Sequence, residues 1–258
     1  MTTSLTQLFD LSGRAAIVTG GSRGLGLEMA EGLAEAGARL TICARREEWL
    51  DPALAELRGR GFTVEGRICD VANPEQVQHV VDATVATYGA VDILVNNAGV
   101  SWGEEPERMP VDKWQKVLDV NLTGAFLFSQ AAGREMLKRQ YGRIINIASI
   151  SGLRASTNGP HYAGYAASKA GLMGLTRELA ASWGRHGIRV NAIAPGFFHS
   201  RLADPAIVQA EPQIKAFSPI PRVGNAGELK GVAVFLAADA SNYITGQTIV
   251  VDGGRTIA

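Results

Sequence analysis

The sequence has few cysteines, no excess of either charge and no long apolar run. Its two cysteines, Cys43 and Cys69, have no second Cys or His at ligand spacing, so we expect buried reduced thiols and no metal site. Lys plus Arg and Asp plus Glu both number 25, and this balance argues against binding of nucleic acid over the whole surface. The longest apolar run, residues 232–238, is too short to span a membrane. Because residues 1–10 also lack a secretory pattern, we expect no membrane partner and a cytoplasmic location.

Short apolar segments alternate with helical patterns along the chain. Each apolar segment is bounded by Gly, Asp, Asn or Pro, which predicts seven strands: residues 15–19, 39–43, 63–69, 93–96, 143–148, 189–194 and 248–251. Leu25, Met29 and Leu33 show the four-residue spacing of a helix after the first strand. Strands that alternate with helices are parallel and joined by right-handed crossovers. We therefore predict an α/β, single-domain Rossmann fold over residues 1–258, with a doubly wound seven-stranded parallel sheet and helices on both faces.

Residues 197–227 interrupt this alternation. They contain four prolines and show no clean period. A long connection without regular structure is typically functional. We therefore expect a substrate-binding loop over about residues 197–227.

The turn after the first expected strand, residues 19–26, is rich in glycine. Gly20, Gly24 and Gly26 leave room for a pyrophosphate at the start of the next helix, where backbone N–H groups and the helix dipole favour an anion. The spacing departs from the commoner G-x-G-x-x-G pattern, because Met29 occupies its last place. A glycine cluster alone is weak evidence, but this one follows a strand and opens a helix, which favours nucleotide binding.

Tyr165 and Lys169 lie four residues apart in a segment with a helical pattern. Residues at this spacing share a helix face, so the phenol and the ammonium can reach one pocket. A nearby cation favours the phenolate and lowers a tyrosine pKa from ~10 toward neutrality. Taken alone, such a pair is more often an ordinary solvated helix face.

Six motifs, taken together and in order, resemble the short-chain dehydrogenase/reductase family over nearly the whole chain. They are the turn at residues 19–26, Asn96-Asn97-Ala98-Gly99, Asn121, Ser149, Tyr165 with Lys169, and Pro195-Gly196. The resemblance implies an NAD(P)-dependent oxidoreductase that interconverts a carbonyl and a secondary alcohol by hydride transfer. It assigns the catalytic roles to Asn121, Ser149, Tyr165 and Lys169.

Each of these four residues has an implied role. Tyr165 is the general acid/base, while Lys169 lowers its pKa and holds the nicotinamide ribose. Ser149 binds the substrate oxygen where charge develops. Asn121 holds a water that links Lys169 to solvent.

One departure from the family pattern concerns the tyrosine. Tyr162 stands thirteen residues after Ser149, the commoner family spacing, whereas Tyr165 stands sixteen after it. Tyr162 has Ala166 rather than a lysine four residues on, so we expect Tyr165 to act. Ser151 is the rival serine, and we expect it to line the substrate pocket.

The residues after the second expected strand indicate the coenzyme. Family members that prefer NAD(H) usually carry an acidic residue where this sequence has Ala44. Arg45 and Arg46 follow, and Arg23 stands in the glycine-rich turn, so two segments bring positive charge to a 2′-phosphate. We expect NADP(H), with NAD(H) as the alternative; Arg46 alone is also explained as a solvated residue at a helix start.

The resemblance assigns a wider set of coenzyme-binding positions: Gly20, Ser22, Arg23, Gly24, Leu25, Gly26, Arg45, Arg46, Asp70, Val71, Asn96, Ala98, Gly99, Tyr165, Lys169, Pro195, Gly196, Phe198 and Ser200. Asp70 matches the position that meets the adenine amino group, although turn chemistry alone also explains an aspartate there. Asn97, next to Asn96, more often stabilises the sheet.

The substrate is indicated only by likeness to some family members. The sequence is similar to gluconate 5-dehydrogenase-like members at three places: Trp102, the longer spacing between Ser149 and Tyr165, and residues 194–198. This similarity favours a sugar acid such as gluconate or 5-ketogluconate as the substrate. A 3-oxoacyl (acyl-carrier or CoA) reductase or another ketone reductase is the alternative, and a non-catalytic dinucleotide-binding module is a remote one. The expected substrate contacts are Ser151, Trp102, Leu153, Tyr162 and Phe197. Arg154 and His199 either meet a substrate carboxylate or are surface charges.

Assembly is also implied by the resemblance. Relatives commonly form tetramers through helices near residues 111–139 and 162–184 and through the last strand. We therefore expect a homotetramer, or a homodimer. Phe126, Phe128 and Met136 are candidates either for that interface or for the core.

Overall fold

All seven predicted strands form, and they make one parallel sheet. The structure is a computed structural model that describes residues 3–155, 161–200 and 203–258. The sheet has the order β3-β2-β1-β4-β5-β6-β7, and every neighbouring pair is parallel. The strands are β1 (Ala15–Thr19), β2 (Arg39–Ala44), β3 (Val64–Ile68), β4 (Ile93–Asn96), β5 (Gly142–Ile147), β6 (Ile188–Pro195) and β7 (Thr248–Val251). The predicted α/β fold is confirmed, and no predicted strand end is off by more than one residue.

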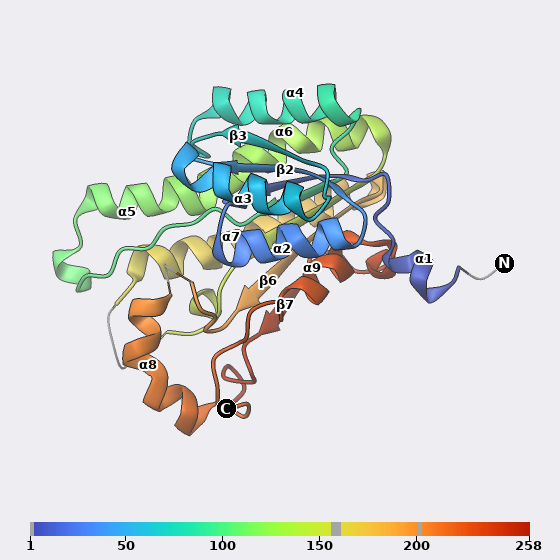
Figure 1. Ribbon diagram of the computed structural model, residues 1–258. Coiled ribbons are helices and arrows are strands. Elements are labelled where there is room, and N and C mark those ends of the chain that lie inside the picture. The colour runs from blue at the N-terminus through green and yellow to red at the C-terminus, as the bar shows by residue number, and fades with distance from the viewer. Residues whose placement is uncertain (1–2, 156–160, 201–202) are drawn as a thin grey trace.

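Helices connect the strands and cover the sheet on both sides (Figure 1). They are α1 (Leu5–Phe9), α2 (Gly24–Glu35), α3 (Glu47–Gly59), α4 (Pro74–Tyr88), α5 (Val111–Leu118), α6 (Gly124–Arg139), α7 (Ala163–Trp183), α8 (Asp204–Phe217) and α9 (Lys230–Ala237). Short 3-10 turns lie at Pro106–Arg108, Ile150–Gly152, Gly184–His186 and Asp239–Ser241. A π-helical turn, Asp119–Thr123, joins α5 to α6 without a break in helical backbone.

Two hydrophobic cores lie on opposite faces of the sheet. Ala16 and Val18 of β1 belong to one core and Ile17 to the other, because successive side chains of a strand point to opposite faces. The first core packs the sheet against α2, α3 and α9, and the second packs it against α4, α6 and α7. Phe128 and Met136 are fully buried in the second core, whereas Phe126 is exposed. Only Phe126 of these three therefore stays a candidate for an interface.

The sheet order creates a crevice at one edge. β1 pairs with β2 on one side and with β4 on the other, so the connections run away from this point in both directions. In open α/β sheets, ligands bind outside the carboxyl ends of the strands at such a switch point. The glycine-rich turn follows β1 at this place.

The expected loop at about residues 197–227 is partly helical. It contains α8, and Phe198 forms a parallel bridge with Gly224; residues 201–202 lie outside the described residues. Ile207 and Ile214, seven residues apart, are buried and mark one face of the helix. Pro212 lies inside α8, which is why the sequence showed no clean helical period. Figure 1 shows α8 near the C-terminus, apart from the helices that cover the sheet.

The two thiols agree with the expectation from sequence. Cys43 and Cys69 are both buried and unpaired. Across the described ranges, no helix combines the length and the apolar character needed to cross a bilayer.

Candidate active site

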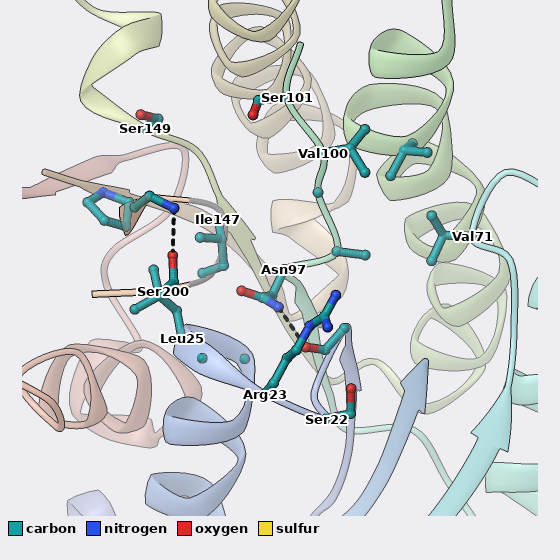
Figure 2. Close-up of a pocket in the computed structure, with 18 of the residues that line it drawn as sticks. Ser22, Arg23, Leu25, Val71, Asn97, Val100, Ser101, Ile147, Ser149 and Ser200 are labelled. Atoms are coloured by element: carbon teal, nitrogen blue, oxygen red, sulfur yellow. Dashed lines mark hydrogen bonds between the residues drawn. The ribbon is translucent and has the colours of Figure 1, made fainter. Parts of the chain in front are cut away.

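A cavity of about 610 Å³ lies at the carboxyl ends of the central strands. Figure 2 looks into it, with Ser22, Arg23 and Leu25 of the glycine-rich turn at one end and Ser149 and Ser101 at the other. This volume falls in the range of pockets that hold cofactors and drug-sized ligands. The cavity is therefore large enough for a dinucleotide of which one part stays exposed to solvent.

Most of the predicted coenzyme positions line this cavity. They are Gly20, Ser22, Arg23, Gly24, Leu25, Gly26, Arg45, Val71, Ala98, Gly99, Tyr165, Lys169, Pro195, Gly196, Phe198 and Ser200. Sequence reasoning missed other lining residues, notably Cys43, Trp49, Cys69, Asn97 and Ser101.

The glycine-rich turn is shaped by backbone that only glycine adopts easily. Gly20 and Gly24 have φ values of 62° and 53°, in the left-handed region. A Cβ on Gly26 would collide with the Asn97 amide and the Gly20 carbonyl. Asn97 Nδ2 donates to the carbonyls of Thr19 and Gly20 at 2.9 and 3.1 Å, which ties the end of β4 to the turn. The N-cap residue Arg23 makes no side-chain cap hydrogen bond, and the first residues of α2, Gly24–Gly26, line the cavity.

Three predicted coenzyme residues do not line the cavity. Asp70 accepts the backbone N–H of Ala72 at 3.0 Å, which is the turn chemistry that was the alternative explanation. Asn96 is buried and donates to Asn146 Oδ1 at 2.8 Å, on the opposite side of the strand from Asn97. Arg46 forms an exposed ion pair with Glu48 at 3.0 Å. A direct contact of these three side chains with coenzyme stays a prediction.

Lys169 is buried at the end of the cavity near β5. Its Nζ donates to the carbonyl of Ile147 at 2.6 Å and lies 5.5 Å from the ring centroid of Tyr165. Only 3% of Lys169 is exposed. Burial lowers the pKa of this ammonium from 10.5 to about 8, so it loses its proton far more easily than a surface lysine.

Tyr165 lies one helical turn before Lys169 on α7 and is half-buried. Burial raises the pKa of the Tyr165 phenol, and a hydrogen bond with Ser149 partly offsets this. Desolvation penalises the phenolate, and the lysine ammonium bonds the Ile147 carbonyl. The lowering of this pKa by Lys169 stays a prediction.

Ser149 follows β5 directly. Its Oγ accepts the N–H of Ser151 at 3.1 Å and so caps the short turn Ile150–Gly152. The Ser149 hydroxyl also hydrogen-bonds the phenol of Tyr165, so the two lie at the same end of the cavity. Ser151, the rival serine, is not among the lining residues.

Asn121 sits in the π-helical turn and is 1% exposed. Its Nδ2 donates to the Val100 carbonyl and to Ser168 Oγ, both at 3.0 Å, and its Oδ1 accepts the Val100 N–H at 2.8 Å. A Cβ on Gly99 would be 3.5 Å from Asn121 Oδ1 and 3.7 Å from Lys169 Nζ. The glycine thus keeps a small space between the amide and the ammonium.

The other end of the cavity is cationic and contains one aromatic ring. The Arg23 guanidinium carbon lies 3.7 Å from the ring centroid of Trp49, and that of Arg46 lies 4.7 Å from it. Arg45 is exposed and lines the cavity. Trp49 stands three residues after Arg46 at the start of α3, and this spacing is the signal that could have found it.

The expected substrate contacts are not among the residues that line the cavity. Trp102 and Leu153 are 43% and 47% exposed, and the ring of Tyr162 packs against Gly103. Phe197 lines a neighbouring cavity of about 330 Å³ under α8. Substrate contact by these residues and by Ser151 stays a prediction.

The two charged candidates have partners of their own. Arg154 donates to the backbone carbonyls of Arg255 and Ala258 near the C-terminus, at 2.7 and 3.4 Å. His199 Nδ1 lies 3.0 Å from Asp204 Oδ1, and both side chains are exposed. These contacts favour the interpretation of both as surface charges.

Comparison with known proteins finds relatives along nearly the whole chain. A family model described as Enoyl-(Acyl carrier protein) reductase matches residues 20–256. The gluconate 5-dehydrogenase of Gluconobacter oxydans is 36% identical over 253 residues, 97% of this chain and 98% of that protein. The 3-oxoacyl-[acyl-carrier-protein] reductase of Synechocystis sp. is 39% identical over 249 residues, 96% of this chain and 98% of that protein. The crystal structure of a gluconate 5-dehydrogenase from Burkholderia cenocepacia J2315, in complex with NADP and tartrate, has a TM-score of 0.93 and 40% identity, covering 99% of this chain and all of that one.

Proposed function

The chain belongs to the short-chain dehydrogenase/reductase family of NAD(P)-dependent oxidoreductases, and we propose on that premise that it interconverts a carbonyl and a secondary alcohol with NADP(H). The observation that carries this proposal is the convergence of Tyr165, Ser149 and Lys169 at one end of a cavity whose other end is the glycine-rich turn. A non-catalytic nucleotide-binding module would need the turn but not the other three residues.

The lining residues suit a dinucleotide along the length of the cavity. The left-handed backbone of Gly20 and Gly24 and the missing Cβ of Gly26 leave space for a pyrophosphate against the uncapped start of α2. Lys169 would hold the nicotinamide ribose, and Pro195 and Gly196 would lie beside the nicotinamide. When bound, the coenzyme supplies or accepts the hydride.

The protein's own residues handle the proton. Because burial keeps the pKa of Tyr165 high, its hydroxyl is protonated and can give a proton to the substrate oxygen during carbonyl reduction. Ser149 holds that oxygen by a hydrogen bond where negative charge develops. Lys169, with its pKa near 8, and Asn121, across the space beside Gly99, form a route by which water returns the proton.

The preference for NADP(H) over NAD(H) rests on charge at the adenosine end. Arg23 and Arg45 both line the cavity, while β2 ends at Ala44 where an acidic residue would favour NAD(H). A 2′-phosphate would gain charged hydrogen bonds from such arginines. The Burkholderia relative with bound NADP supports the same coenzyme.

For the substrate we propose a sugar acid such as gluconate or 5-ketogluconate. The support is likeness to the Gluconobacter and Burkholderia gluconate 5-dehydrogenases. The Synechocystis relative favours a 3-oxoacyl thioester as the second candidate. A screen with both coenzymes tests the proposal: 5-ketogluconate, 3-oxoacyl thioesters and simple ketones are offered with NADPH or NADH, and loss of reduced coenzyme is followed. Coenzyme binding without turnover of any carbonyl would contradict the proposed activity.

Assembly and location complete the proposal. We propose a homotetramer, or a homodimer, in which Phe126 of α6, 41% exposed, contributes to an interface. Light scattering that returns four or two times the chain mass of 27.3 kDa would support it, and a monomer would contradict it. The free thiols of Cys43 and Cys69 fit a reducing compartment such as the cytoplasm.

A further inference from the structure

We infer that Trp49 is a specificity-determining residue, because its indole holds the guanidinium of Arg23 at the end of the cavity where a 2′-phosphate would bind. This inference deepens the proposed function and rests on it. Arg23 and Arg46 lie 3.7 and 4.7 Å from the ring centroid. Trp49 itself lines the cavity and is half-buried.

The ring joins two parts of the chain that are far apart in sequence. Arg23 belongs to the turn after β1, whereas Arg46 and Trp49 belong to the start of α3 after β2. Figure 2 shows the Arg23 side chain extending from the turn toward the middle of the cavity. Contact with Trp49 therefore restricts the directions that this exposed side chain can take.

Electrostatics explain why an aromatic ring is needed here. Arg23 and Arg46 are the N-cap residues of α2 and α3, and neither helix start has a side-chain cap. Each of these two cations thus stands beside the positive end of a helix dipole, and it is repelled both by that helix end and by the other cation. The negative face of an indole offsets this repulsion without neutralising the charge. The carboxylates of Glu47 and Glu48 in the first turn of α3 offset part of it, and Glu48 pairs with Arg46 at 3.0 Å.

NADP⁺ differs from NAD⁺ by its 2′-phosphate dianion. This phosphate would find the arginine side chains at Trp49 already positioned. Arginine side chains that are already positioned lose less conformational entropy when they bind a phosphate. The resulting gain in affinity therefore applies to the 2′-phosphate and not to the rest of the dinucleotide. Trp49 is therefore a positioning residue for coenzyme choice. If the indole instead stacked on adenine, its loss would weaken both coenzymes equally, since both contain adenine.

The test compares Kd values for NADP⁺ and NAD⁺ by calorimetry in the full chain and in Trp49→Leu. We expect the variant to lose about 3- to 30-fold in NADP⁺ affinity, with NAD⁺ affinity changed less than about twofold. Trp49→Phe, which keeps an aromatic face, should retain most of the discrimination.

Two further variants keep the result specific. Trp183→Leu removes another half-buried indole, packed against Gly133 at the far end of α7, and should leave the coenzyme ratio unchanged. In an Arg23→Gln background, Trp49→Leu should cause a smaller further loss, because the contact between the indole and Arg23 is already absent.

The outcomes separate this role from the proposed function. A full chain with no preference for NADP⁺ would contradict both. A preference that survives Trp49→Leu, or an equal loss for NADP⁺ and NAD⁺, would overturn the role of Trp49 and leave the proposed coenzyme intact.

Discussion

The ammonium of Lys169 on α7 donates a 2.6 Å hydrogen bond to the carbonyl of Ile147 at the end of β5. This bond joins the helix that carries Tyr165 to the strand that leads to Ser149. The proton-handling groups are thus held relative to one another by a contact between a helix and the sheet. The roles of Tyr165 and Lys169 can each be tested by a single substitution.

Replacement of Tyr165 by Phe removes the hydroxyl and retains the ring. We expect kcat to fall by about 10²- to 10⁴-fold or more, since that is the usual contribution of a general acid/base. Thermal unfolding should show an intact fold. Tyr162→Phe is the matched control and should retain turnover, because the Tyr162 ring packs against Gly103 outside the cavity lining. The reverse pattern would assign the chemistry to Tyr162.

Lys169→Met should change how stability depends on pH. The folded pKa of Lys169 is about 8 and its ordinary value is 10.5, so between these values the unfolded chain binds more protons than the folded one. The cost of burying the charge is therefore largest below pH 8 and shrinks as the pH rises toward 10.5. Relative to Lys169→Met, the wild-type chain should gain about 2 kcal/mol of unfolding free energy between about pH 7.5 and pH 9.5. Urea unfolding without coenzyme measures this, and a pH-independent difference would contradict the lowered pKa.

Arg45→Ala should change coenzyme choice. A charged hydrogen bond to a 2′-phosphate is worth about 1.5–3 kcal/mol, so the ratio of kcat/KM for NADPH to that for NADH should fall about 10- to 100-fold. Steady-state kinetics with both coenzymes measures the ratio. An unchanged ratio would remove Arg45 from the proposed site.

Gly26→Ala should damage the nucleotide turn. Its new Cβ would collide with the Asn97 amide and the Gly20 carbonyl, which must move apart. We expect a loss of about 1–3 kcal/mol in unfolding free energy and clearly weaker coenzyme binding. Gly59→Ala is the control, because Gly59 ends α3 with open space around its Cβ position. It should be neutral or stabilise the fold by up to about 1 kcal/mol. Equal behaviour of the two variants would contradict the close approach at Gly26.

Residues whose place follows from local spacing were predicted well. Tyr165 and Lys169 share a helix face at any tertiary arrangement, and the glycine-rich turn is defined by its own backbone. The seven strands were also found, because their apolar runs are bounded by turn residues.

The positions missed from sequence depend on contacts between distant segments. Asn96 and Asn97 are neighbours at the end of β4, yet one faces α6 and the other the glycine-rich turn, and only the orientation of the sheet decides which. Trp49 reaches Arg23 across the intervening helix α2 and strand β2, a contact that sequence spacing does not reveal. The pKa of Tyr165 depends on burial, which is equally a property of the assembled cavity.

The π-helical turn at Asp119–Thr123 has a consequence for chain length. The N–H of Gly124 bonds the Asp119 carbonyl five residues back, so this turn accommodates one residue more than an α-helix would. Loss of a single residue from this turn would restore regular α-helical winding and displace the Asn121 amide from its partners at Val100. The position of that amide therefore depends on the number of residues between α5 and α6 as well as on the presence of an asparagine there.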